Sequence, residues 1–382
     1  MLPSQREHFD IPRDICYLNA AAWSPLPLKT QEAGRAAVGR KGQPWKIDPG
    51  LPAEQFARAR RAAAALINAD PDDIALISSV SYGVATAGKA LAVPEGSRVL
   101  VLKDDHSSPV LEWMARADAQ HFTMEVVQPA ADGDWTAALL AAIDRKGAAP
   151  VGLASIASVH WSDGGAVDLD RVAVALRAHG AALLVDATHG AGVMKMDVRT
   201  LDPDFLIFPT YKWVLGPYGR AFLYIAKRRQ DTVPLEQTGF GRRGVSAESP
   251  VYMRDLGYVQ GARRFDMGER DHFISMEMAS IGMEMMTAWG QAAVAGRLRM
   301  LTDRLAEGLR NSAALVADER VRAPHVLCLS FPQGMPEGLI ERLAENDVYV
   351  APRLGRIRIS PHVYNDEQDV DRFVETFRRL TA

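Results

Sequence analysis

A series of short apolar runs, separated by alanine-rich stretches, limits what this chain can fold into more than any other feature. Between the runs, the apolar residues of segments such as Trp135–Lys146 and Leu169–His179 recur at three- and four-residue spacing, which is typical of helices. Several runs are apolar throughout, as in strands that are covered on both faces. The alternation predicts an α/β fold with a large, mostly parallel sheet. We expect its strands at Ile74–Ser78, Arg98–Leu102, Met124–Val127, Val151–Ser155, Leu183–Val185, Phe205–Phe208 and Ala221–Ile225.

The pattern changes after about residue 226. Glu236–Arg264 is rich in Gly, Arg and Ser and reads as a long functional loop, and one long helix is expected over Phe273–Leu309. A smaller α+β domain is expected to follow, with elements at Val326–Phe331, Glu337–Glu345, Val348–Ala351, Arg356–Ser360 and a helix from Asp366. We therefore divide the chain into an N-terminal arm (1–20) that packs with the small domain, a large domain (21–265), and an interdomain helix with the small domain (266–382).

Composition excludes several classes of protein. With 44 Lys+Arg against 47 Asp+Glu the net charge is −3, so the chain offers no basic face for nucleic acid. Its two cysteines, Cys16 and Cys328, suit neither a disulfide framework nor a zinc cluster, and no metal is expected. The first fifteen residues lack the apolar run of a signal peptide, and no window reaches the roughly 18–20 apolar residues of a membrane span. A cytoplasmic protein without a membrane partner is the expectation.

The most specific stretches are LLVDATHGAG (183–192) and DPDFLIFPTYKWVLGPYG (202–219). The first places Asp186 at the end of a buried strand, where α/β sheets carry ligand-binding groups. The second places Lys212 after another buried strand, between two aromatic residues, where partial desolvation lowers the pKa of an amine. Each residue alone has an ordinary interpretation, Asp186 as a turn-capping acid and Lys212 as a surface lysine with a buried stem. Together they are the pair that pyridoxal 5'-phosphate (PLP) requires, an amine for its aldehyde and a carboxylate for its pyridine nitrogen.

At these residues the chain resembles the PLP-dependent class V aminotransferases of fold type I. That family includes cysteine desulfurases, selenocysteine lyases, kynureninases and isopenicillin-N epimerase-like proteins. The resemblance runs from YLNAAAWSPLP near residue 17 to SPHVYN, which ends at Asn365, and covers nearly the whole chain. It implies a large PLP-binding domain, a small C-terminal domain, and a homodimer with its active site at the interface.

The resemblance also implies roles for individual residues. Lys212 would form the Schiff base with PLP and act as the base at the substrate Cα, while Asp186 would pair with the pyridine nitrogen. His189 matches the position that contacts the phenolic oxygen, and His106, in DDHSSPVLEW, the histidine that stacks on the ring and moves protons. Outside the resemblance, a histidine after a strand is usually an ordinary hydrogen-bonded loop residue. A metal site at Asp186 and His189 lacks further ligands at a suitable spacing.

The phosphate needs backbone N–H groups at the start of a helix. SSVSYGVATAGKAL supplies Val80, Ser81 and Tyr82 there, although Ser81 could be a simple N-cap. Tyr211 resembles the kynureninase-like tyrosine that binds the phosphate. Ser158, in ASVHWSDGG, takes the position where relatives closer to the desulfurases carry an asparagine.

Arginines are the expected ligands of the substrate carboxylate, because their planar fork bonds both oxygens. RIRISPHVYN places Arg356 and Arg358 on one face of a strand, and the resemblance selects Arg358. GFGRRG (239–244) matches a dinucleotide fingerprint formally but is not followed by a helical pattern, so we reject that interpretation. Arg242 and Arg243 are instead candidate contacts to an anionic substrate, or solvated surface charge.

The segment RRFDMGERDHF (263–273) resembles the one that reaches the phosphate of the partner subunit. The family often has a threonine after the glycine, whereas this chain has Glu269, whose carboxylate would repel a phosphate. Arg270 or a backbone amide would then have to make the contact.

The absence of one cysteine reduces the number of reactions that we expect of this chain. The desulfurases carry a nucleophilic cysteine shortly before the carboxylate arginine, and the matching NDVYVAPRLGRIR has none. Cys328 lies in an apolar strand pattern, where a thiol is inert. The expected function is a PLP enzyme on a small α-amino acid, either a C–S-type β-lyase or an aminotransferase. The alternatives are an epimerase-like or kynureninase-like reaction, and, in another class, a non-catalytic PLP-fold binding or regulatory subunit.

Overall fold

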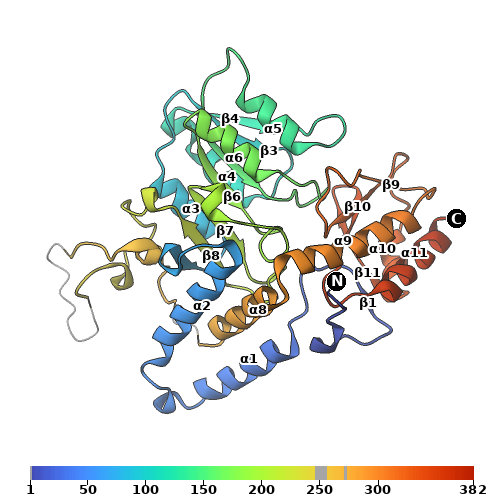
Figure 1. Cartoon of the computed structure of the whole chain (residues 1–382), viewed down its shortest axis with the longest axis horizontal. Coiled ribbons are helices and arrows are strands. Elements are labelled where there is room, and N and C mark those ends of the chain that lie inside the picture. Colours follow the sequence, from blue (N-terminus) through green and yellow to red (C-terminus); the bar gives the residue numbers. More distant parts are fainter. Residues whose placement is uncertain (1, 246–255, 271–272) are drawn as a thin grey trace.

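A seven-stranded sheet forms the centre of the protein (Figure 1). The computed structural model describes residues 2–245, 256–270 and 273–382. The strand order is β2–β8–β7–β6–β5–β3–β4; β8 runs antiparallel to both β2 and β7, and all the other neighbouring pairs are parallel. The predicted α/β fold with a mostly parallel sheet is therefore confirmed. The strands are β2 (Ile74–Ile77), β3 (Arg98–Leu102), β4 (Thr123–Val127), β5 (Val151–Ala157), β6 (Ala182–Asp186), β7 (Phe205–Pro209) and β8 (Ala221–Ile225).

Helices cover both faces of this sheet, because successive strand residues point to opposite sides. In β7, for example, Ile207 packs in one apolar cluster with residues of α3 and α4, while Leu206 and Phe208 pack in the cluster on the other face. The helices of this part are α1 (Leu28–Lys41), α2 (Leu51–Ile67), α3 (Val80–Ala90), α4 (Ser108–Gln120), α5 (Trp135–Ile143), α6 (Leu169–Ala178) and α7 (Val198–Leu201). The helices α1 and α2 are not among the elements predicted from the sequence.

The C-terminal part builds its own four-stranded sheet, in the order β12–β13–β10–β9. The N-terminal β1 (Cys16–Tyr17) pairs in parallel with β11 (Val348–Tyr349), so the first residues lie against this part of the chain. The remaining elements are β9 (Leu315–Val316), β10 (Leu327–Ser330), α10 (Leu339–Ala344), β12 (Ala351–Arg353), β13 (Arg356–Ile359) and α11 (Glu367–Thr381). The domain boundaries remain a prediction.

Two expected elements were wrong. The single helix expected over Phe273–Leu309 is two helices, α8 (Ser275–Trp289) and α9 (Gln291–Gly308). Gly290 separates them with φ +81°, a left-handed conformation that glycine adopts without a steric penalty. The strand expected over Val348–Ala351 is also divided, because β11 pairs with β1 whereas β12 pairs with β13.

Within the described ranges, no helix is both long and apolar enough to cross a membrane.

Candidate active site

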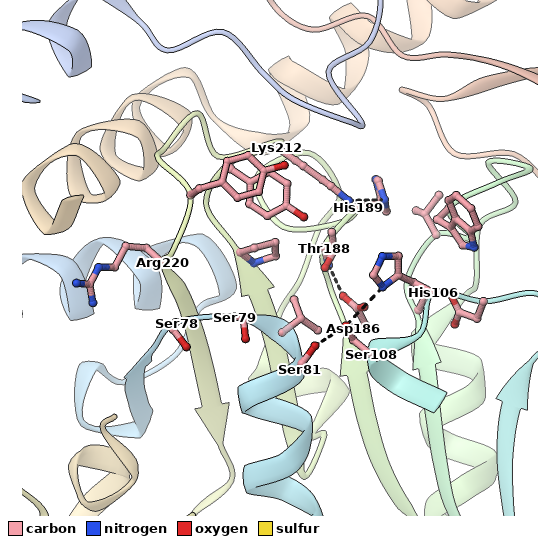
Figure 2. A pocket seen from close by; sticks show the side chains of 18 of the residues that line it. Ser78, Ser79, Ser81, His106, Ser108, Asp186, Thr188, His189, Lys212 and Arg220 are labelled. Atoms are coloured by element: carbon pink, nitrogen blue, oxygen red, sulfur yellow. Dashed lines mark hydrogen bonds between the residues drawn. The ribbon is translucent and has the colours of Figure 1, made fainter. Parts of the chain in front are cut away.

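A cavity of about 320 Å³ opens at the carboxyl ends of the central strands. This edge of an α/β sheet is the usual place for a ligand. The lining side chains come from the start of α3, the segment after β3, the end of β5 and the segment after it, the end of β6, and the loop between β7 and β8 (Figure 2). The residues that line it are Ser78, Ser79, Val80, Ser81, Asp105, His106, Ser108, Ala157, Val159, Trp161, Asp186, Thr188, His189, Pro209, Tyr211, Lys212, Tyr218, Gly219 and Arg220.

Lys212 enters the cavity from the loop between β7 and β8. Its Nζ lies 3.3 Å from His189 Nε2 (Figure 2). Burial, together with the positive charge of Arg358, lowers the pKa of Lys212 to about 7, although Asp186 acts in the opposite direction. A substantial fraction of this amine is therefore unprotonated near neutral pH, as a nucleophile or a base requires.

The loop that carries Lys212 is held in place by α8, which packs against the backbone of the loop. Leu215 adopts φ +56°, and the N–H of Gly216 donates to Thr210 O at 2.8 Å. Gly282 of α8 lies directly against this backbone, since a Cβ added there would contact the Val214 carbonyl oxygen and lie 2.8 Å from the Leu215 carbonyl carbon. The glycine thus allows the helix to approach the lysine loop closely.

Gly282→Ala is expected to lower the free energy of unfolding by about 1–3 kcal/mol, because the backbone must move to admit the methyl group. Urea unfolding measures the change. Gly296→Ala in α9 is the matched control: nothing lies within 4 Å of a Cβ there, so it should be neutral or stabilising by up to about 1 kcal/mol. Equal stability of the two variants would contradict the close contact.

Asp186 ends β6 and is only 5% exposed. Its Oδ1 accepts a hydrogen bond from the Thr188 N–H at 2.9 Å, and Oδ2 has no partner among the described residues. Ser158 donates to the carbonyl oxygen of Asp186 through its N–H (2.9 Å) and its hydroxyl (3.3 Å). The carboxylate is thus held by the backbone around it, with one oxygen free to meet a cationic or N–H group of a ligand.

A second carboxyl group, Asp105, was not predicted. Its Oδ1 accepts from the His106 N–H at 2.7 Å, and Oδ2 is buried without a partner in the described parts of the chain. Burial, and then the negative charge of Asp186, raises the pKa of Asp105 to about 7. Two carboxyl groups therefore face one cavity, and near neutral pH part of the Asp105 population is uncharged.

His106 belongs to a short polar chain on the side of α4. Its Nδ1 lies 3.4 Å from the Ser108 hydroxyl, which lies 3.0 Å from the Ser81 hydroxyl (Figure 2). Trp161 stands edge-on to the imidazole at 6.1 Å between ring centroids. Burial and the charge of Lys212 lower the pKa of His106, so a neutral ring is available to face a ligand.

The start of α3 forms an anion-binding corner of the cavity. Ser79 is the N-cap, whose hydroxyl accepts from the Tyr82 N–H at 3.1 Å, and Val80 and Ser81 line the cavity. Backbone N–H groups at such a terminus attract negative charge. Tyr211 stacks on Tyr218 at 3.8 Å between ring centroids.

Several predicted site residues lie outside the cavity lining, namely Tyr82, Ser158, Arg242, Arg356 and Arg358. Arg358 is 2% exposed, and its Nη1 donates to Trp161 O at 2.7 Å. Its charge still lowers the pKa of Lys212. Arg242 is held within its own loop, where Nη2 donates to Gln237 Oε1 at 2.6 Å. Residues 246–255 of that loop lie outside the described part of the chain.

Sequence reasoning also missed lining residues besides Asp105. Ser79 had a usable signal, because a serine before an apolar helical pattern is a typical N-cap. Arg220 had none: it precedes β8, is 3% exposed, and donates from Nε to the Ser275 hydroxyl at 2.7 Å.

Comparisons with known proteins agree with this geometry. A family model described as aminotransferase class-V matches residues 51–373. The chain is 27% identical over 344 residues to the uncharacterized aminotransferase YcbU of Bacillus subtilis, covering 89% of this chain and 87% of YcbU. It is 26% identical over 389 residues to isopenicillin N epimerase of Streptomyces clavuligerus, covering 96% and 95%.

Among solved structures, the cystine C–S lyase C-DES in complex with its product cysteine persulfide matches with a TM-score of 0.84 and 20% identity, covering 96% of this chain and 98% of the lyase. A variant of C-DES has been solved with glycine covalently linked to the PLP cofactor.

Proposed function

The chain belongs to the class V aminotransferase family, and from this premise we propose that it acts on a small α-amino acid as a β-lyase of C–S-type bonds or as an aminotransferase. The family membership and the fold type I architecture expected from the sequence are confirmed. The observation that carries the proposal is one cavity that brings together the amine of Lys212, the carboxylate of Asp186, the ring of His106 and the N-terminus of α3.

PLP is the cofactor, and the residues present fit it. The free oxygen of Asp186 suits the pyridine nitrogen, Lys212 suits the aldehyde, and the start of α3 with Ser81 suits the phosphate. His189, beside Lys212 Nζ, suits the phenolic oxygen, and Tyr211 can add its hydroxyl at the phosphate. When bound, PLP supplies an aldehyde that bonds amines and a ring that withdraws electrons from the substrate Cα.

The chain's own residues then move protons and bind substrate. Lys212, with its pKa near 7, can accept a proton at neutral pH and return it to a neighbouring atom. The neutral imidazole of His106 provides a second proton carrier in the same cavity. Where the next proton goes decides between elimination, amino-group transfer and epimerisation.

Arg358 is the proposed ligand of the substrate carboxylate. Among the described residues it has no carboxylate partner, and its Nε is buried without a hydrogen bond. Burial lowers the pKa of Arg358 to about 10, and the group remains a cation at neutral pH. Its Nη1 bond to the carbonyl oxygen of Trp161, which lines the cavity, holds the guanidinium close to the cavity. Arg356 and Arg242 stay secondary candidates for this contact.

A persulfide-forming desulfurase is disfavoured by the two cysteines. Both thiols are buried, and burial raises their pKa values, that of Cys328 to about 12. Neither group can supply the exposed thiolate that sulfur transfer requires.

A screen of amino acids for changes in the visible absorbance of the bound cofactor tests the proposal, followed by separation of the products. Pyruvate with released thiol would identify the lyase, and a keto acid the aminotransferase. A racemised amino acid would identify the epimerase-like alternative, which the similarity to isopenicillin N epimerase favours. Cofactor binding without a spectral response to any amino acid would overturn the proposal in favour of a binding or regulatory subunit.

The proposed enzyme is a homodimer with its active site at the interface, as the family resemblance implies. One face of α1 packs on α8, while Leu28, Val38 and, just beyond the helix, Trp45 are exposed, Trp45 by 76%. We propose that these exposed apolar side chains belong to the dimer interface. Sedimentation of a fully active monomer would contradict the dimer.

A further inference from the structure

Behind Lys212, the chain buries an unusual cluster of one tryptophan and three histidines. Trp213 follows Lys212 directly, and its Nε1–H donates to His189 Nδ1 at 3.0 Å. His325 and His362, which precede β10 and follow β13, complete the cluster from the C-terminal part of the chain. The proposed reaction gives none of Trp213, His325 and His362 a role.

We propose that Trp213 is a positioning residue that fixes the tautomer of His189, so that His189 always presents an Nε2–H donor to the cofactor beside Lys212.

The hydrogen-bond inventory supports this assignment. An indole Nε1–H is a donor only, so the His189 Nδ1 that accepts from it carries a lone pair. A neutral imidazole has one N–H, which must then be on Nε2. His189 Nε2 is the atom 3.3 Å from Lys212 Nζ, on the cavity side.

His189 is also held neutral. Burial and the surrounding charged or titratable groups lower its pKa well below the usual range; these groups are Lys212, Arg358, His325 and His106. A neutral ring without Trp213 could carry its proton on either nitrogen, and the Nδ1–H form would turn a lone pair toward Lys212 instead of a donor.

The two histidines from the C-terminal part immobilise the pair. His325 Nε2 donates to the His189 carbonyl at 2.6 Å, and its ring stands edge-on to the Trp213 indole at 4.3 Å. His362 stacks on the indole at 5.5 Å between ring centroids, and its Nε2 donates to the Trp213 carbonyl at 3.2 Å. The indole is thereby packed against two rings, which restrict its rotation and keep its N–H directed at His189.

This inference rests on the proposed function in one respect, that PLP is the group bound beside Lys212 Nζ. The first test needs neither the cofactor nor a substrate. Nitrogen-15 NMR of histidine-labelled apoprotein should contain one neutral ring with a protonated Nε2 and an unprotonated Nδ1 that disappears in His189→Gln. A His189 signal with the proton on Nδ1 would overturn the proposal, whatever reaction the enzyme catalyses and whether or not any Trp213 variant folds.

The second test is a pair of variants read by the pH midpoint of the bound cofactor's visible absorbance. A donor to the phenolic oxygen stabilises its anionic form, so Trp213→Phe should move the midpoint upward by about one pH unit, the size expected for one hydrogen bond to a charged group. In the His189→Gln variant the side-chain amide has an N–H donor that does not depend on Trp213. Adding Trp213→Phe to this variant should therefore leave the midpoint unchanged.

Trp113→Phe is the matched control, because Trp113 is fully buried in the other apolar cluster and its Nε1 has no partner among the described residues. It should leave the midpoint at the wild-type value. An unchanged midpoint in folded Trp213→Phe, or the same shift in both backgrounds, would show that Trp213 does not act through His189.

Discussion

Replacing Lys212 with alanine is expected to abolish covalent capture of PLP and to lower kcat by about 10³-fold or more. Among the described residues that line the cavity, Lys212 is the only lysine. No other amine can therefore bond the aldehyde or accept a proton at the same place. Borohydride reduction followed by mass measurement of the chain detects the captured cofactor, and the amino acid found in the product screen gives kcat.

The depressed pKa of Lys212 adds a pH dependence to this prediction. Because the free amine is the reactive form, the rate of covalent capture by the apoenzyme should rise with pH and level off above about 7. Lys103→Ala is the control, since Lys103 follows β3 near the site but its side chain is exposed. Covalent cofactor in Lys212→Ala, or a rate that levels off only near pH 10, would contradict the assignment.

Asp186→Asn is expected to lower kcat by about 10²–10³-fold, the usual effect of removing one preorganised charge from an active site. The amide keeps the size of the side chain, and its oxygen can still accept from the Thr188 N–H. It loses the negative charge that would hold a protonated pyridine nitrogen. The cofactor absorbance and kcat should change, while the free energy of unfolding without cofactor should stay close to that of the wild type.

Asp204→Asn is the contrasting control, because Asp204 is equally buried at the other end of the sheet. Its Oδ1 accepts from Arg228 Nε at 2.9 Å and from Arg229 Nε at 2.7 Å. Burial raises the pKa of Asp204, but these two bonds and one from the Leu183 N–H outweigh burial and hold the pKa below its usual value. This carboxylate therefore stabilises the fold at neutral pH, and the stabilisation is lost as the pH falls through its lowered pKa. Asp204→Asn should therefore lower the free energy of unfolding by about 1–3 kcal/mol and leave the cofactor spectrum unchanged. A spectral change as large as that of Asp186→Asn would contradict the different roles assigned to the two carboxylates.

Much of the large domain was predictable because several of its strands are apolar throughout. β3 and β8 have the predicted bounds, and each of the other central strands differs from its predicted bounds by one or two residues at one or both ends. Helix α1 was not predicted because its sequence, LKTQEAGRAAVGRK, has no marked apolar face, and the helix buries only Thr30, Gly34 and Ala37. Helix α1 packs against α8, which lies far along the chain, so no local sequence pattern indicates this contact.

The site residues that follow the carboxyl end of a strand were predictable from the sequence. Lys212, Asp186 and His106 all line the cavity, as residues placed at the carboxyl ends of parallel strands should. Ser158 and Arg358 lie outside the lining, since side-chain direction at a strand end depends on neighbours distant in sequence. Ser158 packs against the carbonyl of Asp186, and Arg358 against that of Trp161.

By itself the sequence determined where the central strands lie along the chain and which residues follow their carboxyl ends, because hydrophobic periodicity and strand-end position are local properties. Only the tertiary structure decided that His325 and His362 close around Trp213, that Asp105 shares a cavity with Asp186, and that α8 presses on the lysine loop at Gly282. These contacts join residues up to 149 positions apart, and their energy comes from packing and burial at the meeting point, which leaves no periodic trace along the chain.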